Sequence, residues 1–148
     1  MKTSPFSLCL VFSALVCGGA LRAQEAVADQ IHTPAAGTPE RTAILDVLHR
    51  EYTTGSGSKV KFKVTYFKVH NGWAWIKVVP LNPNGQPEGD EWPSLLRNQN
   101  GTWSSIDLIA VAQGLDESDG PQSPTKRFLQ ALQKKYPAVP ADIVPVGK

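Results

Sequence analysis

The stretch KVKFKVTYFKVHNGWAWIKVVPL, from Lys59 to Leu81, decides the fold. In its first half apolar residues alternate with lysines, which is typical of a strand with one buried face and one wet face. Phe67 and Val69 then continue the parity that the lysines had occupied. A β-bulge at Tyr66-Phe67 would return the apolar side chains to one face, so we predict one there.

The second half of the stretch predicts a hairpin and a buried strand. Asn71-Gly72 suits a tight turn, because both residues accept the positive φ angles that such a turn requires. From Trp73 to Val79 both faces of the next strand are apolar. We therefore expect a central strand that is covered on both sides and ends at Pro80.

A helix is predicted before this hairpin. Thr38 can cap it, Pro39 suits the first helical position, and Glu40 favours the positive end of the helix dipole. The helix should end at the residues Thr53-Thr54-Gly55. Its inner stripe is formed by apolar and aromatic residues at helical spacing, namely Ile44, Leu45, Leu48 and Tyr52.

Two further strands and a second helix are predicted after the hairpin. The strands begin at Trp92 and Thr102, and the second of them is expected to continue to Ala112. Ser123-Pro124 is expected to cap the second helix, whose inner stripe is Phe128, Leu129, Leu132 and Tyr136. The outline is an α+β fold with a helix, a four-stranded curved antiparallel sheet and a C-terminal helix, a cystatin-like or NTF2-like roll by analogy.

The first residues are typical of a secretory signal peptide. Lys2 precedes an apolar run from Phe6 to Val16, and small residues follow. We expect residues 1–23 to be the signal peptide, with cleavage after Ala23. Val16 stands where a lipoprotein signal normally has a small residue before its cysteine, which argues against lipidation of Cys17. The mature chain would then be periplasmic or secreted.

Loss of the signal peptide changes the charge and the available chemistry. Lys2 and Arg22 leave with it, so the mature chain has as many basic as acidic residues. A neutral chain gives no support for nucleic-acid binding, and no stable membrane span is expected once the signal is cleaved. Cys9 and Cys17 also leave, which excludes disulfides, thiol catalysis and cysteine-zinc sites.

The predicted layout is a single small domain with two flanking segments. Residues 24–37 are expected to be a flexible lead-in, residues 38–136 the α+β domain, and residues 137–148 a proline-rich tail that runs over its surface.

Catalytic and metal motifs are missing. His32, His49 and His70 have no second ligand at metal-binding spacing, and no phosphate loop or nucleophile elbow occurs. The acidic stretch DESDG lacks the spacing and the closing glutamate of a calcium loop. We therefore predict no catalytic residues, no metal and no cofactor.

Two candidate sites remain. The first is a binding face that carries tryptophans and lysines, with Trp73, Trp75, Lys61, Lys63 and Lys77 as its residues. Tryptophan is enriched at interfaces, although Trp73, Trp75, Trp92 and Trp103 can equally be core residues, and lysines also protect edge strands. The second is a pocket between the first helix and the sheet, with polar groups from His49, Tyr52, Tyr66 and Asp107.

Three segments together resemble a known group of proteins. RTAILDVLHREY, VKFKVTYFKVHNGWAWIKVVPL and LLRNQNGTWSSIDL are similar to a group of small secreted bacterial proteins with an "ILdalR" helix and a "gWAfv" hairpin. That group has no assigned activity, so the resemblance implies an architecture and export but no site. His49 inside the helix segment and the proline-rich tail depart from its pattern.

The sequence thus favours a non-enzymatic binding or inhibitor-like module that acts on an envelope protein or a cell-wall component. The alternatives are a small-ligand-binding roll with its pocket between the first helix and the sheet, and a structural envelope protein whose tail docks on a neighbour.

Overall fold

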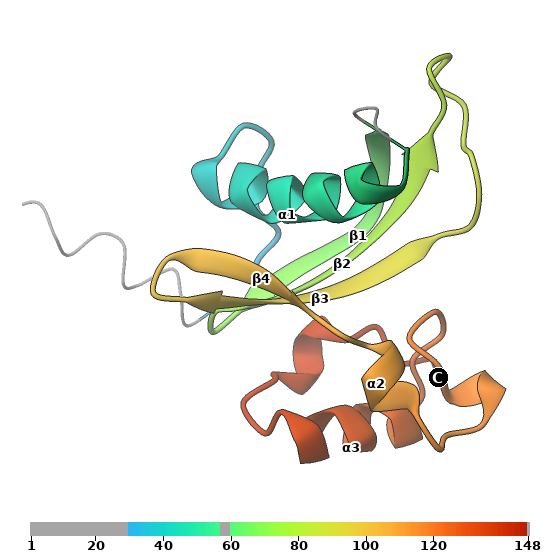
Figure 1. Cartoon of the computed structure of the whole chain (residues 1–148). Helices are drawn as coiled ribbons and strands as arrows, with labels where there is room; N and C mark the ends of the chain where they lie inside the picture. Colours follow the sequence, from blue (N-terminus) through green and yellow to red (C-terminus); the bar gives the residue numbers. More distant parts are fainter. Residues whose placement is uncertain (1–29, 57–59, 148) are drawn as a thin grey trace, which may run out of the picture.

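The computed structural model describes residues 30–56 and 60–147 (Figure 1). The expected signal peptide, the first part of the expected lead-in and Lys59 lie outside the described residues. The elements, in chain order, are α1 (Pro39–Ser56), β1 (Lys61–His70), β2 (Trp73–Leu81), β3 (Trp92–Gln99), β4 (Thr102–Ile106), the short α2 (Ile109–Ala112), α3 (Lys126–Lys135) and two 3₁₀ turns, η1 (Glu117–Asp119) and η2 (Ala141–Ile143). The predicted α+β fold, with a helix, a four-stranded curved antiparallel sheet and a C-terminal helix, is confirmed.

The sheet is a simple antiparallel meander in the order β1-β2-β3-β4. Asn71 and Gly72 turn the first hairpin with φ angles of 49° and 71°, as their sequence predicts. The predicted bulge is also present, slightly earlier than expected. Val64 and Tyr66 pair with the consecutive residues Val78 and Lys77 of β2, so Thr65 is the extra residue.

The sheet is the middle of three layers (Figure 1). On one face α1 packs Ile44, Val47 and Leu48 against a cluster that includes Ile76 and Phe67. On the other face α3, α2 and the C-terminal segment cover a second cluster, which contains Trp73, Trp75, Leu95, Phe128, Leu132 and Ile143. As predicted, β2 is covered on both sides.

Three local expectations about strand and helix ends are wrong. β4 stops at Ile106, and residues that were expected to continue it form α2, because the Asp107 carboxylate accepts a hydrogen bond from the Ala110 backbone N–H at 3.0 Å and starts a helical turn. α3 is capped by Thr125, whose hydroxyl oxygen accepts from the Phe128 N–H at 3.2 Å. Pro80 lies inside β2, which extends to Leu81.

The described part of the lead-in is attached to the sheet rather than loose. His32 exchanges two backbone hydrogen bonds with Val69 of β1, of 2.9 and 2.8 Å. Its ring also contacts the Glu40 carboxylate of α1 at 2.8 Å. Burial lowers the pKa of His32, but the hydrogen bonds that its ring makes with the Glu40 carboxylate and the Gln30 carbonyl outweigh this effect and raise it. Residues 30–37 therefore tie β1 to the start of α1.

The proline-rich tail is part of the core. Val139, Ile143 and Val144 are buried in the second cluster, and the Tyr66 hydroxyl donates to the Ile143 carbonyl at 3.0 Å. Prolines prevent a helix here, and the segment instead folds back beneath β2 with η2 as its one helical turn.

This packing predicts that the tail contributes to stability. Ile143→Ala should lower the free energy of unfolding by about 2–5 kcal/mol, because it leaves a cavity in the second cluster. Ile109→Ala is the matched control; Ile109 is 77% exposed, so its truncation should change the value by no more than about 0.5 kcal/mol. Urea unfolding measures both, and equal midpoints for the two variants would show that the tail does not support the fold.

Candidate functional site

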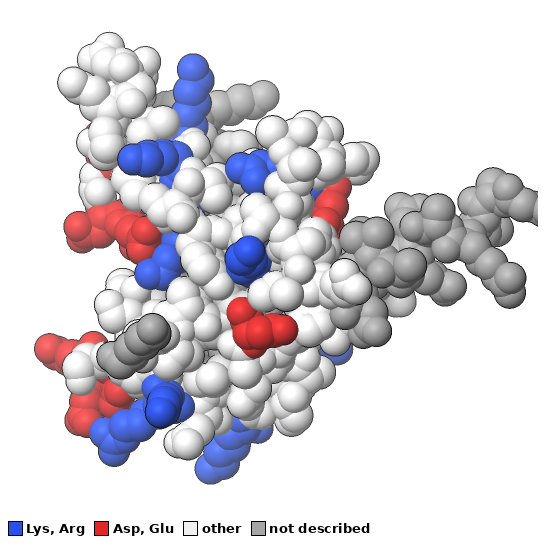
Figure 2. Space-filling view, turned by 180° about the vertical axis from the view of Figure 1, so that it is seen from behind, with Lys and Arg blue, Asp and Glu red and all other residues white. Residues whose placement is uncertain are grey.

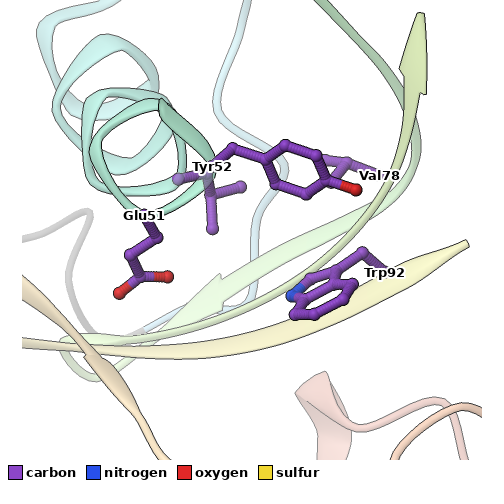
Figure 3. Close-up of a pocket in the computed structure, with 5 residues that line it drawn as sticks. Glu51, Tyr52, Val78 and Trp92 are labelled. Atoms are coloured by element: carbon purple, nitrogen blue, oxygen red, sulfur yellow. The ribbon is translucent and has the colours of Figure 1, made fainter. Parts of the chain in front are cut away.

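A hollow opens where the C-terminal part of α1 lies over the sheet (Figure 3). Its volume is about 230 Å³, and it is lined by Leu48, Glu51 and Tyr52 of α1, by Val78 of β2 and by Trp92 of β3. Leu48 and Val78 are buried members of the core cluster under α1, so the floor of the hollow is formed by the edge of that core.

Trp92 differs from the other three tryptophans. Its exposed fraction is 54%, whereas Trp73, Trp75 and Trp103 are buried. Trp92 begins β3 and pairs with Val78, at the end of the sheet where α1 stops covering it. Its indole therefore stands at the rim of the hollow instead of inside the core.

Tyr52 forms the opposite wall. Its ring meets the Trp92 indole at a centroid distance of 5.8 Å with the planes at 78°. A second edge contact, with Phe62 of β1 at 5.3 Å, holds the tyrosine ring from behind. Such near-perpendicular aromatic pairs are a favoured geometry, so the two walls support each other.

A second hollow of about 360 Å³ continues from the first, because Glu51 and Trp92 line both. Its other walls come from the ends of β3 and β4 and from the loops that follow, and they are Pro93, Ser94, Ser105, Ile106, Asp107, Leu108, Ile109, Pro121 and Gln122. Most of its polar groups are hydroxyls, an amide and carboxylates, so this hollow is more polar than the first.

The acidic groups of the two hollows are held in place. The Glu51 carboxylate accepts a hydrogen bond from the Ser105 hydroxyl, which links α1 to β4. Asp107 is held by its bond from the Ala110 N–H. The site is thus built from segments that are far apart in the sequence and fixed to each other.

Of the four predicted pocket residues, two line a hollow, but they do not line the same one. Tyr52 lines the first hollow and Asp107 the second. His49 instead stacks on Phe62 at 5.0 Å and lines neither hollow. Tyr66 faces the opposite side of the sheet, where burial, with a smaller effect from Asp142, raises its pKa.

The predicted tryptophan and lysine face is not assembled as expected. Trp73 and Trp75 are buried under α3 and the tail, and Trp75 packs edge-on against Phe128. Both are therefore core residues, and the prediction that they lie on a binding surface is wrong. Lys61 and Lys63 are exposed on β1. On the side of the molecule that Figure 2 shows, the basic side chains are scattered among acidic and uncharged ones and form no continuous patch.

Lys77 is engaged within the fold. Its ammonium group donates to the Glu91 carboxylate at 2.8 Å and to the Gln122 carbonyl at 2.9 Å. The hydrogen bond from Lys77, followed by one from the Thr65 hydroxyl, lowers the pKa of Glu91. This lysine therefore fastens the loop before β3 to the fold.

The described residues contain neither a metal-binding cluster nor a membrane-spanning helix that would provide another candidate site. Within residues 30–56 and 60–147, no group of three or more histidine, cysteine, aspartate or glutamate side chains is placed to hold a metal ion. In the same part of the chain, no helix is both long enough and apolar enough to cross a bilayer.

The lowered pKa of Glu91 predicts a pH-dependent contribution to stability. Because the folded state favours the ionised carboxylate, the contribution is complete above the pKa of Glu91 in the unfolded chain and is lost as pH falls through its lower pKa in the folded chain. Glu91→Gln should cost less than about 1 kcal/mol at neutral pH, since the carboxylate is partly exposed, and nothing in strong acid. Urea unfolding of both proteins from neutral pH to pH 3 tests this, with Glu117→Gln as a control for surface charge. If the difference in the free energy of unfolding between the two proteins stayed constant across that pH range, the stabilisation would not come from the ionised Glu91 carboxylate.

Comparisons with known proteins do not assign this chain to a family. No protein-family model matches the chain, and neither the curated proteins nor the solved structures contain a significant match to it. The resemblance to small secreted bacterial proteins therefore stays a prediction, and the function has to be argued from the site itself.

Proposed function

We propose that this chain is an exported, non-enzymatic protein that binds a small ligand in the pocket between α1 and the sheet. The observation that carries the proposal is Trp92, which is 54% exposed at the rim of an open hollow and packs edge-on against Tyr52 there. A single exposed apolar residue is ordinary, but a tryptophan and a tyrosine that together border a concave apolar surface are typical of a ligand site.

The size and rigidity of the site support a small ligand. The two hollows, of about 230 and 360 Å³, together fall in the range of small-molecule pockets. Phe62 holds Tyr52, and Ser105 holds Glu51, so the walls are in place before a ligand arrives. A preorganised site loses little conformational entropy on binding.

The lining supports binding rather than turnover. Among the described residues that line the two hollows there is no histidine, cysteine, lysine or arginine. Glu51 and Asp107 are each hydrogen-bonded within the fold, and neither stands next to a serine with a histidine base. These features favour a module that holds its ligand without chemical change.

The other two functions lose the residues on which they depended. The predicted partner-binding or inhibitor-like face consisted of Trp73, Trp75, Lys61, Lys63 and Lys77. Its two tryptophans are buried and Lys77 is paired within the fold, so Lys61 and Lys63 are the members that remain exposed. A structural role through the tail required apolar groups that a neighbour could cover, and Val139, Ile143 and Val144 are already buried in the chain itself. An export address, from the signal-like residues 1–23, remains part of the proposal.

The proposal predicts ligand-dependent changes at Trp92. Isotope-labelled protein would be titrated separately with tetramethylammonium chloride, sodium benzoate, N-acetylglucosamine and indole while NMR follows the Trp92 indole N–H and the Val78 methyl groups. We expect at least one probe to shift these signals saturably, because the hollow is open and preformed.

Trp92→Ala should abolish the shift of Val78 by removing one wall. Ile31→Ala, a truncation of another exposed apolar residue that lines neither hollow, should leave it unchanged. If no probe of any class moved Trp92 or Val78, the proposed function would be wrong.

A further inference from the structure

We propose that the second hollow, at the end of β4, binds a neutral sugar ring, whose hydroxyl groups bond to the buried Ser94 side chain and whose C–H groups pack on Trp92 and Ile109. This inference rests on the proposed function and names a ligand class for the part of the site that continues from the first hollow.

The second hollow exists because β4 is shorter than β3. β4 pairs with β3 only from Leu95 to Gln99, so residues 92–94 of β3 have a neighbouring strand on the β2 side alone. Figure 1 shows β4 leading into α2, away from the sheet. The hollow of about 360 Å³ is bordered by the start of β3 and by the residues that follow β4, so it occupies the place of a longer β4. Its size lies at the lower end of the range of small-molecule pockets.

Ser94 places a polar group in the buried part of this hollow. Its side chain lines the hollow although the residue is only 5% exposed. None of the hydrogen bonds among the described residues involves its hydroxyl. A buried hydroxyl without a partner is unfavourable, and a purely hydrocarbon ligand would leave it unpaired. The position therefore favours a ligand that brings its own hydrogen-bonding group.

The same hollow has an apolar side. Trp92 and Ile109, which are 54% and 77% exposed, both line it. Tyr52 packs edge-on against Trp92 but lines only the first hollow, so part of the indole surface is available to a ligand in the second. A sugar ring carries C–H groups as well as hydroxyls. It can therefore pack on these residues while it bonds to Ser94.

The charges of the lining favour a neutral ligand. The exposed Asp107 carboxylate would repel an anion, and the described lining residues include no lysine or arginine to offset it. The buried polar group, Ser94, is uncharged, so it cannot replace the hydration that a cation would lose. At the rim Gln122 has an amide that both donates and accepts, as the hydroxyl groups of a sugar do. Neither Glu51 nor its bond to Ser105 has to change.

NMR titration of the full mature chain tests the inference. The probes are the neutral methyl glycosides of glucose, galactose and N-acetylglucosamine, and the signals are the Ile109 methyl groups and the Trp92 indole N–H. We expect at least one glycoside to shift both signals saturably, because both residues line the second hollow.

Three analogues of the same ring test the ligand class. Methyl glucuronide adds a negative charge, methyl glucosaminide adds a positive charge, and tetrahydropyran lacks all the hydroxyls. Each should bind at least about threefold more weakly than the best neutral glycoside, because it meets Asp107, loses hydration or leaves Ser94 without a full set of partners.

Ser94→Ala removes the hydroxyl and leaves the apolar side intact. It should weaken binding of the glycoside by roughly threefold to tenfold and change the weak binding of tetrahydropyran little. Ser104→Ala is the matched control, because Ser104 is exposed on β4 and lines neither hollow. The midpoint of thermal unfolding should not fall in Ser94→Ala, since its hydroxyl has no partner in the described chain. A clear fall in that midpoint, with glycoside binding unchanged, would show that the hydroxyl serves the fold alone.

The outcomes distinguish this inference from the proposed function. If no neutral glycoside shifted Ile109 while indole or benzoate still shifted Val78, the sugar assignment would be wrong and the first hollow would remain a binding site. Equal or tighter binding of either charged analogue, or of tetrahydropyran, would also overturn the ligand class. If no probe of either set moved Trp92 or Val78, both proposals would fall.

Discussion

The structure depends on the burial of both faces of β2. Ala74, Ile76 and Val78 point to one side of the strand and the two tryptophans to the other, so each face needs an apolar cover. Burial of a tryptophan removes a large apolar surface from water, and a strand that is apolar on both sides cannot lie at the surface. The three-layer arrangement, with α1 above and α3 and the tail below, follows from this requirement.

The same requirement explains features that are otherwise unrelated. Extra residue Thr65 in β1 keeps Phe62 and Val64, before the bulge, on the same face as Phe67 and Val69 after it, so α1 meets a continuous apolar surface. The proline-rich tail is ordered because α3 covers only part of the tryptophan face, and Val139 and Ile143 complete it. The site arises at the other end of the molecule, where α1 ends and β3 begins with Trp92 still uncovered.

Local patterns in the sequence predicted most of the fold. Alternation with period two in β1, Asn-Gly at the turn and the double-sided strand after it each act over a few residues, and all three are present. The error at α2 has a physical cause. The apolar run after Asp107 suits either a strand or a helix, and the carboxylate of Asp107, bonded to the Ala110 N–H, favours the helical turn.

The site was less predictable, because it depends on where one layer stops covering another. The residues around Trp92 predict the start of a strand, as those around Trp103 do, but they do not show how much of either side chain a helix covers. What sets Trp92 apart is its position at the start of β3 opposite Val78, where Tyr52 of α1 packs against it and still leaves it 54% exposed. Glu51 was missed for a related reason. Its partner Ser105 lies 54 residues away on β4, so no motif connects them.

Because the site forms where α1 stops covering the sheet, its residues differ from those that stabilise the fold. Trp73 and Trp75 are buried in the second cluster, and their loss would leave large cavities under the sheet. Trp92 is half exposed, and Glu51 and Asp107 lie at the surface, so burial of these three side chains contributes little to the core. Tyr52 and Trp92 pack edge-on against each other near the surface, and Phe62 supports the tyrosine ring, so they form the wall of the hollow rather than part of the buried core.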